Sequence, residues 1–160
     1  AYPRWSPTGE AIAYIRMEDS NIPFTVGELV ITDGEGRDER VIAAVDAGHG
    51  YPPVWSPDGR QVAFVVRGNP EDRQADVEAL ALESNIYMAV VASGEVRAVT
   101  RFEGARTEAP AWSPDGAWLA FSTDAGGVPD IWLAEVATDA VYQVTQSAHA
   151  RCPIWVAGRK

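Results

Sequence analysis

The sequence predicts an all-β protein built from repeats of four strands, and three observations support this. The pentapeptide Trp-Ser-Pro-Asp-Gly occurs at residues 55–59 and 112–116, with a near copy at 5–9 and a faded copy from Trp155. The four repeat tryptophans are 50, 57 and 43 residues apart, a period typical of propellers and solenoids. Between these turns, short apolar runs alternate with turn residues, which is typical of strands.

The first repeat shows how its four strands arise. In the turn at 6–9, Pro7 presets φ at the second position and Gly9 accepts the positive φ that closes the hairpin. The serine hydroxyl at the start of the turn is expected to bond the backbone amide two residues on. A second turn is expected at 33–36. The strands of this repeat are therefore expected at 2–5, 11–15, 28–32 and 40–45.

The next two repeats follow the same order. Their second strands are apolar at consecutive positions, so both faces of each sheet must be covered, as they are when small sheets stack radially. The predicted fold is a β-propeller fragment with three four-stranded antiparallel blades, at 1–50, 51–108 and 109–150, plus the first strand of a fourth at 151–160. The strands are expected at 53–56, 61–66, 85–91 and 96–100, then at 109–113, 118–122, 130–136, 141–145 and 152–156.

An insertion at residues 69–84 interrupts the second blade. Asn69 is a suitable helix N-cap, Pro70 suits the first helical position, and two acidic residues follow in the first turn. A short helix on the propeller rim is expected there, and an acidic loop is the alternative.

The repeat also resembles a known family. Its pattern is Pro-x-Trp-Ser-Pro-Asp-Gly, an Ala-Phe strand, Asn-Ile-Tyr or Asp-Ile-Trp, and Val-Thr, as at 53–59, 63–64, 85–87 and 99–100 and again between 110 and 145. It is similar to the WD40-like repeat of TolB-type proteins and of the propeller domains of prolyl-oligopeptidase-like peptidases. Thr8 departs from the pattern where Asp is usual, and the copy at Trp155 lacks the turn.

Composition and motifs exclude several classes of function. The net charge is −10 without a run of Lys or Arg, so we expect no nucleic-acid partner, and no apolar run is long enough for membrane insertion. Cys152 is the only cysteine, so an internal disulfide is impossible. Neither a Gly-x-Ser-x-Gly elbow nor a His-Glu-x-x-His helix is present. We therefore expect no catalytic site, metal site or cofactor in this chain.

The repeat motif itself is interpreted as structural. A tryptophan at a fixed place in every blade is expected to pack between adjacent sheets, and Trp55→Ala is expected to cost on the order of 3–5 kcal/mol. Asp58 and Asp115 are expected to serve their turns, because one carboxylate per turn falls short of the oxygen ligands that calcium needs.

Candidate binding residues precede each repeat tryptophan, on the loops that lead from one blade into the next. Equivalent loop positions on successive blades fall on one face of a propeller, near its channel. An arc of polar and cationic groups is therefore expected there, suited to a carboxylate or an acidic peptide; ordinary solvated loops are the alternative. These residues are His49, Arg106 and His149, six before a tryptophan, and Tyr51, Glu108 and Arg151, four before one.

The favoured hypothesis is a non-enzymatic module that binds protein or peptide partners through this loop face, as the resemblance to TolB-type domains implies. That resemblance also implies a periplasmic or extracellular location, which the residues alone leave open. The alternative is the substrate-screening propeller of a serine peptidase whose catalytic domain is not in this chain. A third candidate, a propeller for sugars or small molecules, is suggested only by His49 and His149.

Three blades would leave two open faces of apolar sheet, and propellers close with about four to eight blades. We therefore expect either the remainder of a larger propeller or a homo-oligomer, for example two copies that form a six-bladed ring.

Overall fold

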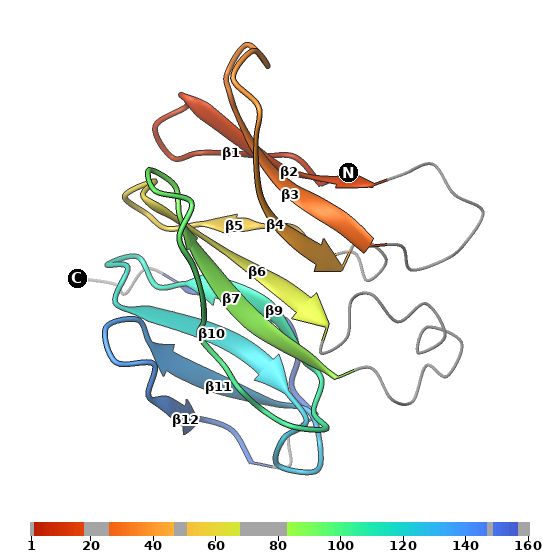
Figure 1. Cartoon of the computed structure of the whole chain (residues 1–160). Coiled ribbons are helices and arrows are strands. Elements are labelled where there is room, and N and C mark those ends of the chain that lie inside the picture. The colour runs from red at the N-terminus through yellow and green to blue at the C-terminus, as the bar shows by residue number, and fades with distance from the viewer. Residues whose placement is uncertain (1, 18–25, 47–50, 68–82, 147–148, 157–160) are drawn as a thin grey trace.

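The computed structural model describes residues 2–17, 26–46, 51–67, 83–146 and 149–156, and in these ranges all regular secondary structure is β-strand. Three antiparallel sheets of four strands stack on one another (Figure 1). Blade 1 contains β1 Arg4–Trp5, β2 Ala11–Met17, β3 Val26–Asp33 and β4 Arg40–Asp46. Blade 2 contains β5 Val54–Trp55, β6 Gln61–Arg67, β7 Ser84–Val90 and β8 Val96–Ala98. Blade 3 contains β9 Thr107–Trp112, β10 Trp118–Thr123, β11 Asp130–Glu135 and β12 Val141–Gln143.

Each sheet is a meander in which the strands pair in sequence order. The first strands β1, β5 and β9 contact one another from blade to blade, so they form the inner edge of the stack. This arrangement confirms the predicted fold class of three four-stranded propeller blades. No helix among the described residues is long and apolar enough to cross a membrane.

Three expectations are corrected or remain open. The segment predicted as the first strand of a fourth blade, 152–156, makes no ladder, because no neighbouring strand lies beside it within the described residues. In the insertion, β7 already begins at Ser84, and residues 69–82, where the helix was expected, lie outside the described residues. In blade 3, β9 begins at Thr107 and so includes Glu108.

The repeat turns show why serine, aspartate and glycine recur. In blade 2, the Gly59 amide donates to the Ser56 carbonyl at 2.9 Å, and Gly59 has a φ of 71°. The buried Ser56 hydroxyl accepts the Gln61 amide at 2.9 Å, five residues on, and donates to Asp58 at 2.6 Å. The expected bond two residues on is made by Asp58, which accepts the Arg60 amide at 3.0 Å.

The same turn recurs in the other two blades. In blade 3, Ser113 and Asp115 repeat these contacts. In blade 1, Thr8 takes the place of the aspartate and lies 3.2 Å from the Ser6 hydroxyl. Within the described residues no three His, Cys, Asp or Glu side chains are grouped to hold a metal ion.

The hydrophobic core lies between the blades, because each β-strand sends alternate side chains to opposite faces of its sheet. Ala13 and Ile15 of blade 1 pack with Val62 and Phe64 of blade 2. Ala63 and Val65 of blade 2 pack in the same way with Leu119 and Phe121 of blade 3. In blades 1 and 2, the forward face, which carries Ala13 and Ile15 or Ala63 and Val65, is covered by the next blade. The covering, backward face of that next blade carries Phe64 or Phe121.

Two further contacts repeat from blade to blade. At the inner edge, the indole N–H of Trp55 donates to the Arg4 carbonyl at 2.9 Å, and that of Trp112 to the Val54 carbonyl at 3.1 Å. Each tryptophan thus binds the residue that precedes the tryptophan of the blade before it. At the outer edge, Arg40 donates to the Val91 carbonyl at 2.6 Å and Arg97 to the Val136 carbonyl at 2.7 Å.

The interblade position of the tryptophans predicts unequal effects of substitution. Trp55 is half-buried and binds blade 1, so Trp55→Ala is expected to lower the free energy of unfolding by about 2–3 kcal/mol, below the ~3–5 kcal/mol typical of a fully buried tryptophan. Trp5 is 58% exposed, so Trp5→Ala is the matched control and is expected to cost under about 1 kcal/mol. Chemical denaturation measures both values, and equal losses would contradict this role.

The aspartates of the turns predict a pH dependence of stability. Hydrogen bonds from Ser56 and Ser113, and then from backbone amides, hold the pKa of Asp58 and Asp115 below the ordinary value. Their stabilisation is therefore present above about pH 4, the unfolded-state value, and is lost as pH falls through the lower folded-state pKa.

The double variant Asp58→Asn/Asp115→Asn keeps an acceptor in each turn and removes this titration. It should show a smaller loss of unfolding free energy than the wild type between pH 7 and pH 3, measured by denaturant titration. The control is Asp38→Asn, at an exposed position outside the repeat turns. An unchanged loss in the double variant would refute the assignment.

Candidate functional site

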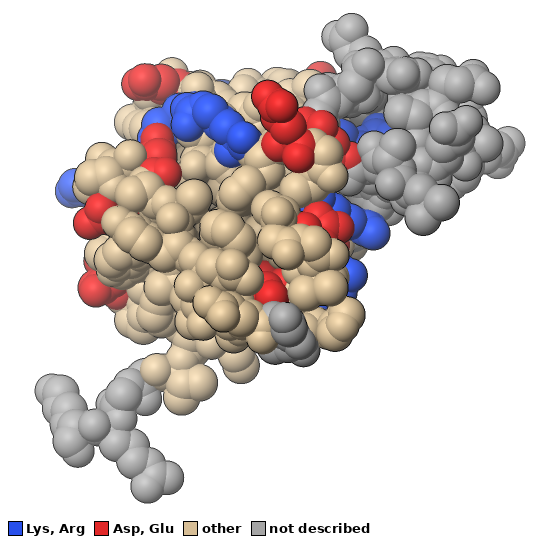
Figure 2. All heavy atoms as spheres, turned by 90° about the horizontal axis from the view of Figure 1, so that it is seen from below, with Lys and Arg blue, Asp and Glu red and all other residues tan. Residues whose placement is uncertain are grey.

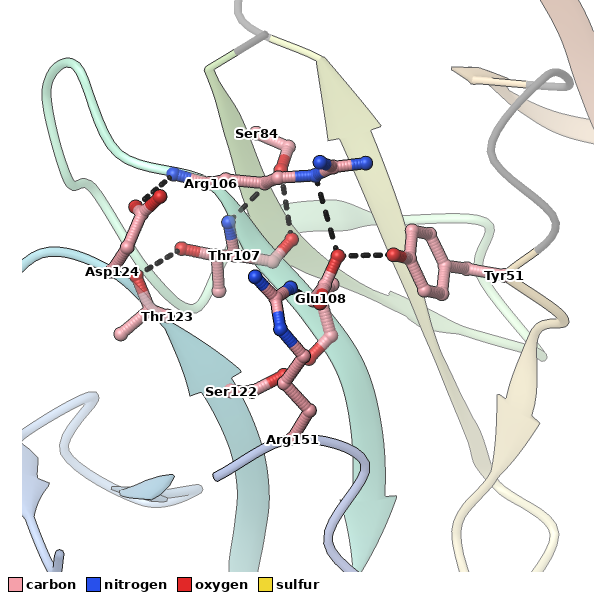
Figure 3. A network of polar contacts seen from close by, with 9 residues as sticks. All are labelled: Tyr51, Ser84, Arg106, Thr107, Glu108, Ser122, Thr123, Asp124 and Arg151. Carbon is pink, nitrogen blue, oxygen red and sulfur yellow. Dashed lines mark hydrogen bonds and ion pairs between the residues drawn. The ribbon is translucent and has the colours of Figure 1, made fainter. Parts of the chain in front are cut away.

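Residues that precede three of the repeat tryptophans meet at the beginning of β9. Tyr51, Glu108 and Arg151 each lie four residues before a tryptophan, and the structure brings all three together (Figure 3). Arg106 joins them from the same loop as Glu108. The predicted positions thus form one cluster, to which three successive repeats contribute.

Glu108 is the centre of this cluster. Its side chain is only 6% exposed, yet both carboxylate oxygens are used. Oε1 pairs with the Arg151 guanidinium, while Oε2 accepts the Tyr51 hydroxyl and lies 3.3 Å from Nε of Arg106. A buried carboxylate is costly unless it is paired and hydrogen-bonded, and these three partners meet that requirement.

A β-bulge places Glu108 in this position. In the pairing of β9 with β10, Ala111 faces Ala120 but Glu108 faces Ser122, so β9 contains one extra residue. Ala109, within the bulge, has a φ of 54°. Bulges redirect side chains and are frequent beside functional sites. Cys152, also three residues before its tryptophan, has a φ of 52°, so the bend belongs to the repeat and not to β9 alone.

Neighbouring strands hold the backbone of residues 106–108 rigidly. The buried Ser84 hydroxyl donates to the Thr107 carbonyl at 2.8 Å and accepts the Thr107 amide at 2.9 Å. From blade 3, Asp124 accepts the Arg106 amide at 2.7 Å. The two supporting residues, Ser84 and Asp124, do not lie on the repeat motif, so no periodic signal in the sequence indicated them.

The Tyr51 hydroxyl donates a hydrogen bond to Glu108. Burial raises the pKa of Tyr51 far above its ordinary value, and the hydrogen bond to Glu108 and the negative charge of that carboxylate raise it further. The phenol is therefore protonated at neutral pH and remains a donor to Glu108.

The two arginines give the cluster its chemistry. Arg106 and Arg151 are 38% and 49% exposed, and each contacts Glu108 through one nitrogen, so other guanidinium N–H groups face solvent. Both cations pair with the single buried carboxylate of Glu108, while the Asp124 carboxylate binds the Arg106 amide, in a chain whose net charge is −10. Guanidinium groups are suited to carboxylates because their N–H donors match both carboxylate oxygens.

The remaining predicted residues are placed differently. His149 is exposed and lies two residues before Arg151, while His49 lies outside the described residues. Glu108 was expected as one member of an open polar arc. Glu108 is instead buried and pairs with both guanidinium groups, which makes it the anchor of the cluster.

Comparison with known proteins supports the fold. No family model matches the chain. It is 29% identical over 146 residues to the uncharacterized peptidase YuxL of Bacillus subtilis, a match that covers 76% of this chain and 21% of that protein.

Two solved structures extend the similarity. TolB from Acinetobacter baumannii matches 92% of this chain and 32% of its own, with 24% identity and a TM-score of 0.65. A prolyl endopeptidase matches 93% of this chain and 22% of its own, with 14% identity and a TM-score of 0.70. The chain thus spans between a fifth and a third of these proteins. Its three sheets are blades of a β-propeller similar to those of TolB and of prolyl-peptidase propeller domains.

Proposed function

We propose that this chain is a non-enzymatic β-propeller module that binds a protein or peptide through the loop face formed by Tyr51, Arg106, Glu108 and Arg151. The observation that carries the proposal is the buried Glu108, which holds two partly exposed arginines close together. Its ligand is an acidic segment or a free carboxylate of the partner.

The geometry favours binding for an energetic reason. Arginine side chains lose conformational entropy when a ligand immobilises them. Here Glu108 has already restricted both guanidinium groups in the free protein, so a smaller cost remains on binding. His149, which is exposed two residues before Arg151, belongs to the same proposed face.

A second candidate function rests on the similarity to the peptidase YuxL and to a prolyl endopeptidase. In such a protein the same loop face would admit peptides to a catalytic domain carried elsewhere in the polypeptide. The reading frame of the parent gene separates the two candidates, because a Gly-x-Ser-x-Gly elbow downstream would favour the peptidase.

Binding can be measured by fluorescence anisotropy with a labelled peptide of alternating glutamate and glycine. Arg106→Ala/Arg151→Ala is expected to weaken binding at least tenfold, because a hydrogen bond to a charged group contributes about 1.5–3 kcal/mol. The matched control is Arg37→Ala/Arg60→Ala, which removes the same two positive charges from exposed turn positions.

The control variant should bind as the wild type does, and a peptide with lysine in place of glutamate should not bind. If both double variants weaken binding equally, the effect is net charge alone and the site is wrong. If the wild type does not bind the glutamate peptide, carboxylate recognition is refuted.

A further inference from the structure

The forward faces of blades 1 and 2 are each packed against the next blade, but within the described residues no further blade lies over the forward face of blade 3. Trp118 and Ala120 of β10 occupy the positions that Ala11 and Ala13 occupy on the covered forward face of blade 1. Beside them, Leu133 and Tyr142 contribute apolar surface, and Tyr142 is 51% exposed. Figure 2 views the molecule from this side and shows a broad uncharged area with charged side chains around its margin.

The segment 154–156 already lies where the inner strand of another blade would lie. The Trp155 indole donates to the Ala111 carbonyl at 2.9 Å, which is the bond that Trp55 and Trp112 make to their preceding blades. Trp155 and Val156 border an open pocket of about 550 Å³ together with Pro114, Trp118 and Leu133. Val156 itself is 80% exposed.

The backbone of this segment presents an unused donor. In the three complete repeats, the amide one residue after the tryptophan, at Ser6, Ser56 and Ser113, donates to a second-strand carbonyl at 2.8 Å. Val156 is the equivalent residue, and within the described ranges its amide has no such acceptor. An exposed apolar sheet face beside an unpaired strand edge is a surface for strand addition.

We infer that segment 154–156 and the forward face of blade 3 together accept one antiparallel β-strand from another polypeptide segment. That strand pairs with Val156 and carries apolar side chains at two alternating positions, as β6 does with Val62 and Phe64. The occupant is thus a strand of this repeat type, and its apolar pair covers Trp118 and Leu133, which are still partly exposed. This inference is independent of the carboxylate site.

Blade 1 of a second copy does not fit this surface. Its Trp5 would need the Ala111 carbonyl that Trp155 already occupies. Its backward face also carries Arg16, which pairs with Glu28 and Glu39 at 2.9 and 3.1 Å. Stacking would bury these three charges against an apolar face, which is costly. The continuity of the repeat contact therefore favours an added strand over the six-bladed ring of two copies.

A peptide with the sequence of residues 60–67 tests the inference directly, since it is the second strand of blade 2. At saturating concentration it should raise the Tm of the chain by roughly 5 °C. The control peptide replaces the residues corresponding to Val62 and Phe64 by serine and keeps the same charge. It should leave the Tm unchanged.

Two variants of the chain locate the effect. Val156→Pro removes the backbone donor at an exposed position and is expected to abolish the shift. Val41→Ser changes an apolar residue that is 51% exposed on blade 1 and should leave the shift intact. A shift that survives Val156→Pro, or the absence of any shift, would overturn the inference.

Light scattering tests whether a second copy of the chain occupies this face instead. The 17.3 kDa chain could form a stable dimer that Leu133→Ser dissociates and the peptide leaves intact. That result would assign the face to a second copy and refute the inference of an added strand. If the peptide dissociates such a dimer, the inference of an added strand is supported.

Discussion

The fold depends on one packing constraint, the contact of the apolar forward face of one blade with the phenylalanine-bearing backward face of the next. Phe64 and Phe121 are almost completely buried in these contacts, and each such burial contributes about 1.5–3 kcal/mol. A single four-stranded sheet of this kind has two apolar faces and cannot cover either one alone. Both hydrophobic clusters of the described residues therefore lie between blades, and the interblade bonds of Trp55, Trp112, Arg40 and Arg97 fix their alignment.

The candidate site follows from the same constraint. Because the inner strands of adjacent blades run side by side, residues at the same position of successive repeats lie close together. Tyr51, Glu108 and Arg151 share that position but differ in chemistry, and this difference converts a structural repeat into a hydrogen-bonded cluster. The packing residues stay alike from blade to blade, while the loop residues before them vary.

The two open faces of the stack are chemically unlike. Blade 1 carries the ion pair of Arg16 with Glu28 where blade 2 has Val66 and Asn85 and blade 3 has Thr123 and Asp130. Blade 3 instead presents Trp118 and Tyr142, whose rings meet edge to face with centroids 5.9 Å apart. Tyr142 also stands where blades 1 and 2 have the arginines of the outer interblade bonds. A surface for association therefore exists at one end of the stack, and a charged surface at the other.

The sequence by itself determined the repeat, the number of complete blades, nearly all strand positions and the structural role of the Trp-Ser-Pro-Asp-Gly turn, because these depend on local turn chemistry and side-chain periodicity. It also indicated the loop positions of the candidate site. Only the tertiary structure decided that Glu108 is buried, that Ser84 and Asp124 hold its segment, and that residues 152–156 form no ladder. Those properties depend on which residues of different blades meet across the stack, and a strand exists only where another strand pairs with it.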